Sequence, residues 1–113
     1  MIRKIIKFFF LKTFIWEFLT KFKNKFLLKF GKSFSADQID IKLRRYLDYK
    51  DGFFIELGAN DGVRQSNTLH FEKFLNWSGI LIEPSIRFKD LVKNRSKKNY
   101  FYNIACCSFD DKN

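Results

Sequence analysis

Carboxylates and glycines are closely spaced in the segment FFIELGANDGV, at residues 53–63 of this 113-residue chain. A buried strand needs apolar residues, and it needs neither the glycines nor the polar pair that follow Leu57. Glycines permit tight turns and the close approach of a ligand to the backbone. The segment therefore predicts a ligand-binding loop whose candidate residues are Glu56, Gly58, Asn60, Asp61 and Gly62.

A further acid lies twenty-five residues beyond Gly58, where Glu83 ends the apolar run GILIE and precedes Pro84. Ligands of parallel α/β sheets bind beyond the carboxyl ends of the strands, and a carboxylate there accepts hydrogen bonds from the hydroxyls of a ribose. Glycines followed by an acid after about 20 residues are typical of dinucleotide sites. We therefore expect Glu83 to bind a ribose, and the helix after the loop to point free N–H groups at the ligand.

The loop charges distinguish between two classes of ribose ligand. A dinucleotide fingerprint has the pattern G-x-G-x-x-G, whereas this loop has E-x-G-A-N-D-G, with Glu56 before the first glycine and Asp61 inside the turn. Two carboxylates would repel a pyrophosphate, but they suit the sulfonium and ammonium groups of S-adenosylmethionine. The expected cofactor is therefore S-adenosylmethionine, and a nucleotide-dependent oxidoreductase is disfavoured.

The hydrophobic pattern around these acids predicts an α/β fold. Apolar runs at 53–57, 79–83 and 100–106 are predicted strands, and they alternate with predicted helices at 68–75 and 86–95. Single helices between strands imply parallel pairing with right-handed crossovers, and hence a doubly wound sheet.

The sequence also predicts helix caps and the roles of individual helix residues. Ser35 and Gln38 have the spacing of a capping box for a helix that stops before Asp51, and Ser66 and Asn67 are read as caps of the next helix. The first of these helices carries Ile39, Leu43, Tyr46 and Leu47 at helical spacing. In the predicted helix at 86–95, Phe88, Leu91 and Val92 are expected to face inward. His70, the only histidine, and Trp77 are expected to have structural roles rather than catalytic ones.

Basic residues are concentrated at the N-terminus. Residues 1–34 carry nine Lys or Arg and one acid, whereas residues 35–113 carry thirteen and eleven. Charges interrupt the apolar runs too often for a membrane span of about 20 apolar residues, and no cleavage site of a signal peptide follows. At 100° per residue the segment predicts an amphipathic helix or helix pair. Its apolar face holds Ile5, Phe8, Ile15, Leu19, Phe22, Phe26 and Phe30, and its polar face holds Lys4, Lys7, Glu17, Lys21, Asn24, Lys25 and Lys29.

Two interpretations of this helix stay open. Its Phe residues and Trp16 suit burial in an anionic lipid surface, with the lysines at the headgroups, or the helix packs on the rest of the protein. The net charge of +10 raises the question of nucleic acid, but no zinc-finger, homeodomain or RNP motif is present. Nucleic-acid binding is therefore not expected.

Cys106 and Cys107 are adjacent, and their spacing predicts neither a disulfide framework nor a metal site. We expect buried thiols in a reducing cytosol.

The run FFIELGANDGVRQSNTLHFEKFLNWSGILIEPS, followed by KNRSKKNYFYNIACCSF, resembles the FkbM family of S-adenosylmethionine-dependent methyltransferases. The resemblance covers roughly residues 36–110 and comprises E-x-G-A-N-D-G, Q-S-N-T, W-x-G-I-L-I-E-P and N-x-A, in that order. It implies a partial Rossmann-like sheet of the class I methyltransferase type, truncated after its third strand and preceded by the basic amphipathic helix.

The resemblance also implies roles for individual residues. Ala59 would join Glu56, Gly58, Asn60, Asp61 and Gly62 around the methionyl part of the cofactor. Glu83 would hold the ribose hydroxyls, and Pro84 would shape the adjacent turn. Ile104 and Ala105 would lie near the adenine. Catalytic residues are not assigned, because the acceptor pocket would be built by later strands.

The sequence therefore predicts two domains, 1–34 and 35–113, of which the second is the cofactor-binding half of a methyltransferase. The expected reaction is O-methylation of a sugar, a glycan or another hydroxylated small molecule, and a missing C-terminal half is an implied partner. The expected location is the cytoplasm, with peripheral membrane contact through residues 1–30. The alternative is a non-enzymatic membrane-surface or interaction protein derived from a truncated methyltransferase.

Overall fold

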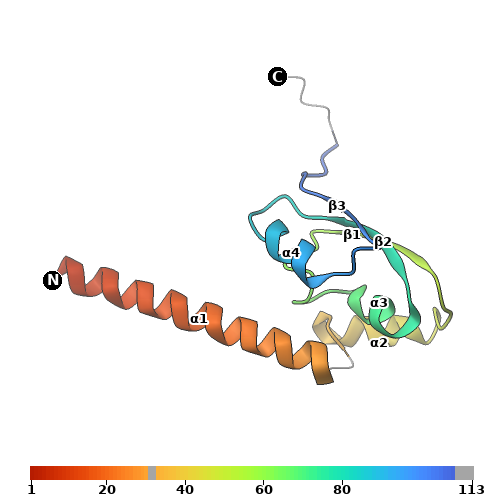
Figure 1. The fold of residues 1–113 in the computed structure, drawn as a ribbon, viewed down its shortest axis with the longest axis horizontal. Helices are drawn as coiled ribbons and strands as arrows, with labels where there is room; N and C mark the ends of the chain where they lie inside the picture. Colours follow the sequence, from red (N-terminus) through yellow and green to blue (C-terminus); the bar gives the residue numbers. More distant parts are fainter. Residues whose placement is uncertain (31–32, 109–113) are drawn as a thin grey trace. The chain divides into compact units, whose positions relative to one another are not determined.

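The computed structural model describes the backbone of residues 1–30 and 33–108, and the side chains of residues 1–19, 21–22 and 33–108. The chain divides into two compact units, Met1–Gly31 and Lys32–Asn113. In the first unit, one continuous helix, α1, spans Ile2–Phe30, so the predicted N-terminal helix is single rather than paired (Figure 1). The expected positions of Asn24, Lys25, Phe26, Lys29 and Phe30 on its faces lie outside the described side chains.

The second unit is an α/β fold built on a parallel sheet with the strand order β1-β2-β3 (Figure 1). The α/β class and the parallel pairing predicted from the sequence are therefore confirmed. Its elements are a short 3-10 helix at Ala36–Gln38, α2 at Ile39–Arg44, β1 at Phe53–Leu57, α3 at Leu69–Leu75, β2 at Ser78–Ile82, α4 at Phe88–Asn94 and β3 at Tyr100–Tyr102.

The hydrophobic core lies on one face of this sheet. Glu56 of β1 pairs in register with Leu81 of β2, which pairs with Phe101 of β3, so the three side chains share a face with Phe54. The core cluster draws its members from this face, from α3 and α4, and from the segments after β1 and before β2: Phe54, Ala59, Phe71, Leu75, Trp77, Leu81 and Leu91. Helices α3 and α4 therefore pack on the same side of the sheet, as right-handed crossovers in the order β1-β2-β3 require.

The opposite face of the sheet is apolar and exposed. Phe53, Ile55 and Leu57 alternate with the buried residues of β1, and in β3 the exposed Tyr100 and Tyr102 flank the partly buried Phe101. Within the described part of the α/β unit, the crossover helices cover only one face. The helices expected on a second face of a doubly wound sheet are not among these described elements.

The third strand is shorter than predicted. β3 ends at Tyr102, because the side-chain amide of Asn103 donates a hydrogen bond to the Glu83 carbonyl at 2.7 Å. This amide takes the acceptor that a continuing strand would use for its own N–H. Cys106 and Cys107 therefore lie beyond the sheet and are exposed, contrary to the expected burial.

The helix caps and the burial of individual helix residues also differ from the predictions. Ser35 caps through Asp40 rather than Gln38: its Oγ accepts from the Asp40 N–H at 2.9 Å, and Gln38 itself has a left-handed backbone. Helix α2 ends at Arg44, well before Asp51, so Tyr46 lies outside the helix and is exposed. Ile39 and Leu43, at helical spacing in α2, are exposed. Of the residues expected to face inward from α4, Val92 is exposed, whereas Leu91 is fully buried.

Candidate active site

The loop after β1 lies against the end of β2. The N–H groups of Gly58 and Ala59 both donate to the carbonyl of Ile82, at 2.9 and 3.0 Å. The next N–H, of Asn60, donates to Oε2 of Glu83 at 2.7 Å. The structure thus brings the glycine-bearing loop and the distant acid together at the carboxyl edge of the sheet, as the sequence predicted.

The two loop glycines have left-handed backbones but different surroundings. Gly58 has φ +70°, and a Cβ added there would have no atom within 4 Å. Gly62 has φ +81°, and a Cβ there would lie 2.7 Å from the side chain of Arg95 and 2.8 Å from that of Leu91. Gly58 therefore borders open space beside the loop, whereas Gly62 allows the loop to pack on α4.

Glu83 is buried, with 7% of its surface exposed, and its carboxylate holds the turn that follows β2. Its Oε1 accepts a hydrogen bond from the Ser85 N–H at 2.9 Å, across the exposed Pro84. Burial alone would raise the pKa of this carboxyl. Hydrogen bonds from the Ser85 side chain and from the N–H groups of Ser85 and Asn60 outweigh that effect, and the pKa lies below its ordinary value of 4.5. Glu83 is therefore ionised at neutral pH.

Glu56 faces the helix-covered side of the sheet and is occupied by internal partners. Its carboxylate accepts hydrogen bonds from the hydroxyls of Ser66 and Thr68 and from the N–H of Asn67 at 3.1 Å. It also forms an ion pair with Arg95 at 3.4 Å. The negative charge of Glu56 is thus neutralised within the protein.

Arg95 connects two buried acids with the loop after β1, and this role was not predicted from the sequence. Its guanidinium is fully buried and pairs with Glu72 at 2.8 Å as well as with Glu56. It also donates to the carbonyl of Gly62 at 3.2 Å and lies 5.4 Å from the ring centre of Phe54. In the sequence Arg95 belongs to the basic run KNRSKK, which is typical of a solvated surface, so nothing in the pattern indicated its burial.

Asp61 shapes the loop from within. Its Oδ1 accepts from the N–H groups of Val63 and Arg64, at 3.0 and 2.8 Å, and its carbonyl accepts from Asn94. At the start of α3, Ser66 Oγ accepts from the N–H groups of Thr68 and Leu69, so the predicted cap at Ser66 is confirmed. The expectation that these N–H groups point freely at a ligand is wrong, because side chains of the loop accept their hydrogen bonds. Asn67 contributes its backbone N–H to Glu56 rather than a side-chain cap.

The remaining candidate residues from the sequence lie outside the assembly of the loop after β1 and Glu83. Ile104 and Ala105 follow the end of β3 and are exposed, so the structure does not add them to the loop assembly. His70 is buried against Phe74, and Trp77 is buried with its Nε1 donating to the carbonyl of Tyr49 at 2.7 Å. Both side chains are therefore packed within the α/β unit.

The described residues therefore define an α/β protein with a parallel sheet and a glycine loop tied to an ionised acid at its carboxyl edge. Comparison of the chain with protein-family models, curated proteins and solved structures gave no significant match.

Proposed function

We propose that the α/β unit binds S-adenosylmethionine at the carboxyl edge of β1 and β2, as the cofactor-binding part of a methyltransferase of FkbM type. The observation that carries this proposal is the position of the open space at Gly58 beside a loop bonded to the Glu83 carboxylate. Ligands of parallel α/β sheets bind beyond the carboxyl ends of the strands, and this loop and acid lie at that edge.

The ribose is assigned to Glu83. An ionised carboxylate only accepts hydrogen bonds and offers about four lone-pair sites, which suits a pair of vicinal hydroxyls. Among its present donors, the N–H groups of Ser85 and Asn60 belong to the backbone, whereas the Ser85 hydroxyl turns on a single bond. A ribose hydroxyl therefore replaces the Ser85 hydroxyl without any change in the backbone.

The methionyl part of the cofactor is assigned to the space along Gly58, Ala59 and Asn60. Glu56 and Asp61 then act by holding the loop in shape, because their oxygens accept from the loop's own donors. S-adenosylmethionine supplies the methyl group, and the residues of this chain bind and orient it. Catalysis of methyl transfer rests on aligning an acceptor oxygen with that methyl group, and a hydroxylated small molecule or glycan is the proposed acceptor.

The hydrogen bonding of the loop favours this ligand over a dinucleotide. A pyrophosphate is bound by several free N–H groups at a helix N-terminus. In this loop the backbone donors have internal acceptors: Gly58 and Ala59 bond to Ile82, Asn60 to Glu83, Gly62 to Ala59, and Val63 and Arg64 to Asp61. These six N–H groups are therefore not available to phosphate oxygens.

Isothermal titration with S-adenosylhomocysteine tests the assignment. The wild-type chain is expected to release heat on binding, and Glu83→Ala to bind at least about tenfold more weakly, because a hydrogen bond to a charged group contributes about 1.5–3 kcal/mol. Asp48→Ala is the matched control, because Asp48 is an exposed acid away from the loop. NAD is expected to give no heat. Equal heats for wild type and Glu83→Ala would remove the site.

A further inference from the structure

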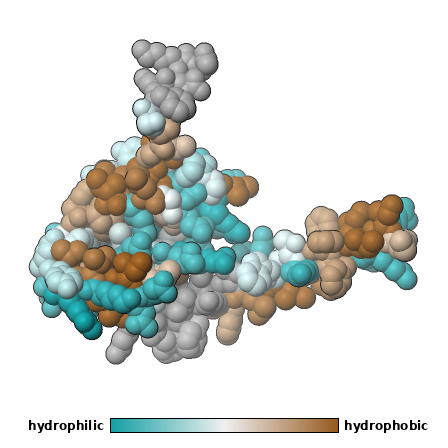
Figure 2. Space-filling model, turned by 180° about the vertical axis from the view of Figure 1, so that it is seen from behind, coloured by the Kyte–Doolittle hydropathy of each residue, from teal (hydrophilic) through white to brown (hydrophobic). Residues whose placement is uncertain are grey.

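Helix α1 exposes an unusual number of large apolar side chains. In its described part, exposed residues occur in every turn: Ile2, Ile5, Ile6, Phe8, Phe9, Phe10, Leu11, Phe14, Ile15, Trp16, Phe18, Leu19 and Phe22. Figure 2 shows these apolar side chains interspersed with hydrophilic ones along the helix. Exposed apolar patches of this extent are typical of interaction surfaces rather than of a helix surrounded by water.

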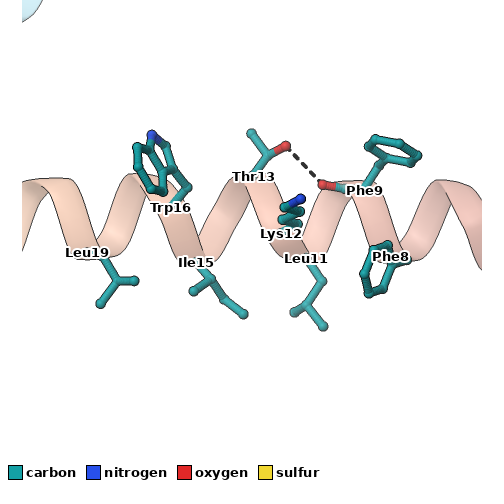
Figure 3. Close-up of a pocket in the computed structure, with 8 residues that line it drawn as sticks. All are labelled: Phe8, Phe9, Leu11, Lys12, Thr13, Ile15, Trp16 and Leu19. Carbon is teal, nitrogen blue, oxygen red and sulfur yellow. Dashed lines mark hydrogen bonds between the residues drawn. The ribbon is translucent and has the colours of Figure 1, made fainter.

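The side chains between residues 8 and 19 lie along two rows. Figure 3 shows Phe8, Ile15 and Leu19 on one side of the helix, with Phe9 and Trp16 on the other. Thr13 lies between Phe9 and Trp16, and its hydroxyl donates to the carbonyl of Phe9 at 2.9 Å. Because this hydroxyl is bonded within the helix, it needs no water partner when the surface around it is covered by an apolar phase.

The charged residues of α1 are almost all basic. The helix contains eight basic residues and a single acid, Glu17. Lys12 lies within the apolar stretch of Figure 3, and a lysine stem is long enough to lie along an apolar surface while its ammonium reaches the polar layer. No helix in the described part of the chain combines the length and apolar character required to cross a membrane.

We propose that α1 binds the surface of a membrane that contains anionic lipids, lying in the plane of the interface. The aromatic and aliphatic side chains enter the acyl boundary, and the basic side chains pair with the lipid phosphates and carboxylates. The composition favours lipid over nucleic acid. The basic residues of α1 would attract either polyanion, but its eight phenylalanines would have no role in contacts to a phosphate backbone, whereas they suit the acyl boundary of a bilayer.

Vesicle flotation of the full chain tests this proposal. Binding is expected to phosphatidylcholine vesicles that contain phosphatidylserine, and to weaken when the phosphatidylserine is omitted or the salt is raised. The triple variant Lys4→Glu, Lys7→Glu, Lys21→Glu should lower the affinity by about a hundredfold. The matched control is Lys89→Glu, Lys93→Glu, Lys97→Glu, which makes the same charge change in the α/β unit and should leave binding close to wild type.

The two tryptophans supply a second measurement. Trp16 is 59% exposed and Trp77 is 5% exposed, so only Trp16 is placed to enter the lipid. A blue shift of the emission on adding anionic vesicles is expected in wild type and in Trp77→Phe, and it should be lost in Trp16→Phe. This last variant keeps an aromatic side chain, so it preserves the helix.

Three results would overturn the proposal. The first is no flotation with anionic vesicles at low salt. The second is equal loss of binding in the two triple variants. The third is retention of the chain by single-stranded RNA or duplex DNA while the Trp16 emission does not change with vesicles.

Discussion

The N–H of Asn60 and the carboxylate of Glu83 are joined by a 2.7 Å hydrogen bond, although the two residues are 23 positions apart. Asn60 has a left-handed backbone, with φ +53°, which asparagine tolerates better than most residues do. This conformation turns its N–H toward the sheet edge. The shape of the loop after β1 therefore depends on the acid that follows β2, and the two halves of the candidate site form one assembly.

The buried ion pairs of Arg95 should dominate the stability of this assembly. Arg95→Ala leaves Glu56 and Glu72 buried without their cation, and we expect a loss of about 3–5 kcal/mol in the free energy of unfolding. Urea unfolding followed by circular dichroism measures this loss. Lys97→Ala removes an exposed basic residue two positions away and should change stability by less than about 0.5 kcal/mol. A similarly small change in Arg95→Ala would contradict the structural role of the network.

The two loop glycines should respond differently to alanine. Gly58→Ala adds a methyl group into open space, so it costs only the left-handed backbone, about 1–2 kcal/mol. Gly62→Ala has the same backbone cost and also places a methyl group 2.7–2.8 Å from Arg95 and Leu91, so its loss of stability should be greater.

The affinity for the ligand should also differ between Gly58→Ala and Gly62→Ala. The Gly58 methyl group occupies the space assigned to the cofactor, so Gly58→Ala should weaken S-adenosylhomocysteine binding more than its modest loss of stability explains. Urea unfolding and isothermal titration of both variants give the comparison. Equal stability losses at Gly58 and Gly62 would show that the surroundings of the two glycines are alike in solution.

Asp40 should contribute to the acid sensitivity of the α/β unit. Burial of its carboxylate alone would raise the pKa. Hydrogen bonds from the Ser33 side chain, the Phe34 N–H, the Ser35 side chain and the Ile41 N–H outweigh that effect and lower the pKa below 3.8. A pKa that is lower in the folded state than in the unfolded state stabilises the fold above the unfolded value. That contribution is lost as the pH falls through the folded value.

Stability should therefore decline between about pH 5 and pH 2, and part of that decline should be absent in Asp40→Asn. Urea unfolding at a series of pH values measures the slope for the two proteins. Asp37→Asn, at an exposed neighbouring acid, is the control and should keep the wild-type slope. An unchanged slope in Asp40→Asn would mean that Asp40 has the same pKa in the folded and unfolded states.

The bounds of β1, α3 and β2 agree to within one residue with those predicted from the sequence. Each of these elements coincides with a short apolar run bounded by glycine, proline or polar residues. The parallel order of those strands was enough to predict that Glu83 and the Gly58 loop meet. Both inferences depend on local pattern and chain connectivity, which a single sequence contains.

Features that depend on distant side chains were not predictable in this way. The pairing of Arg95 with Glu56 joins residues 39 positions apart, and a basic run has the same appearance whether it is buried or solvated. The end of β3 is set by a side-chain hydrogen bond from Asn103, which the apolar run through Cys106 did not reveal. Leu91 and Val92 are adjacent apolar residues on a short helix, and only the position of the sheet decides which of them is buried.

The most direct test of the proposed site is a titration of the ¹⁵N-labelled chain with S-adenosylhomocysteine, followed by amide NMR shifts. We predict that the largest shifts occur in residues 58–62 and in Glu83 and Ser85, with the Asn60 amide among them because it is bonded to the carboxylate that receives the ribose. Unchanged spectra at high ligand concentration, or shifts confined to other parts of the chain, would contradict it.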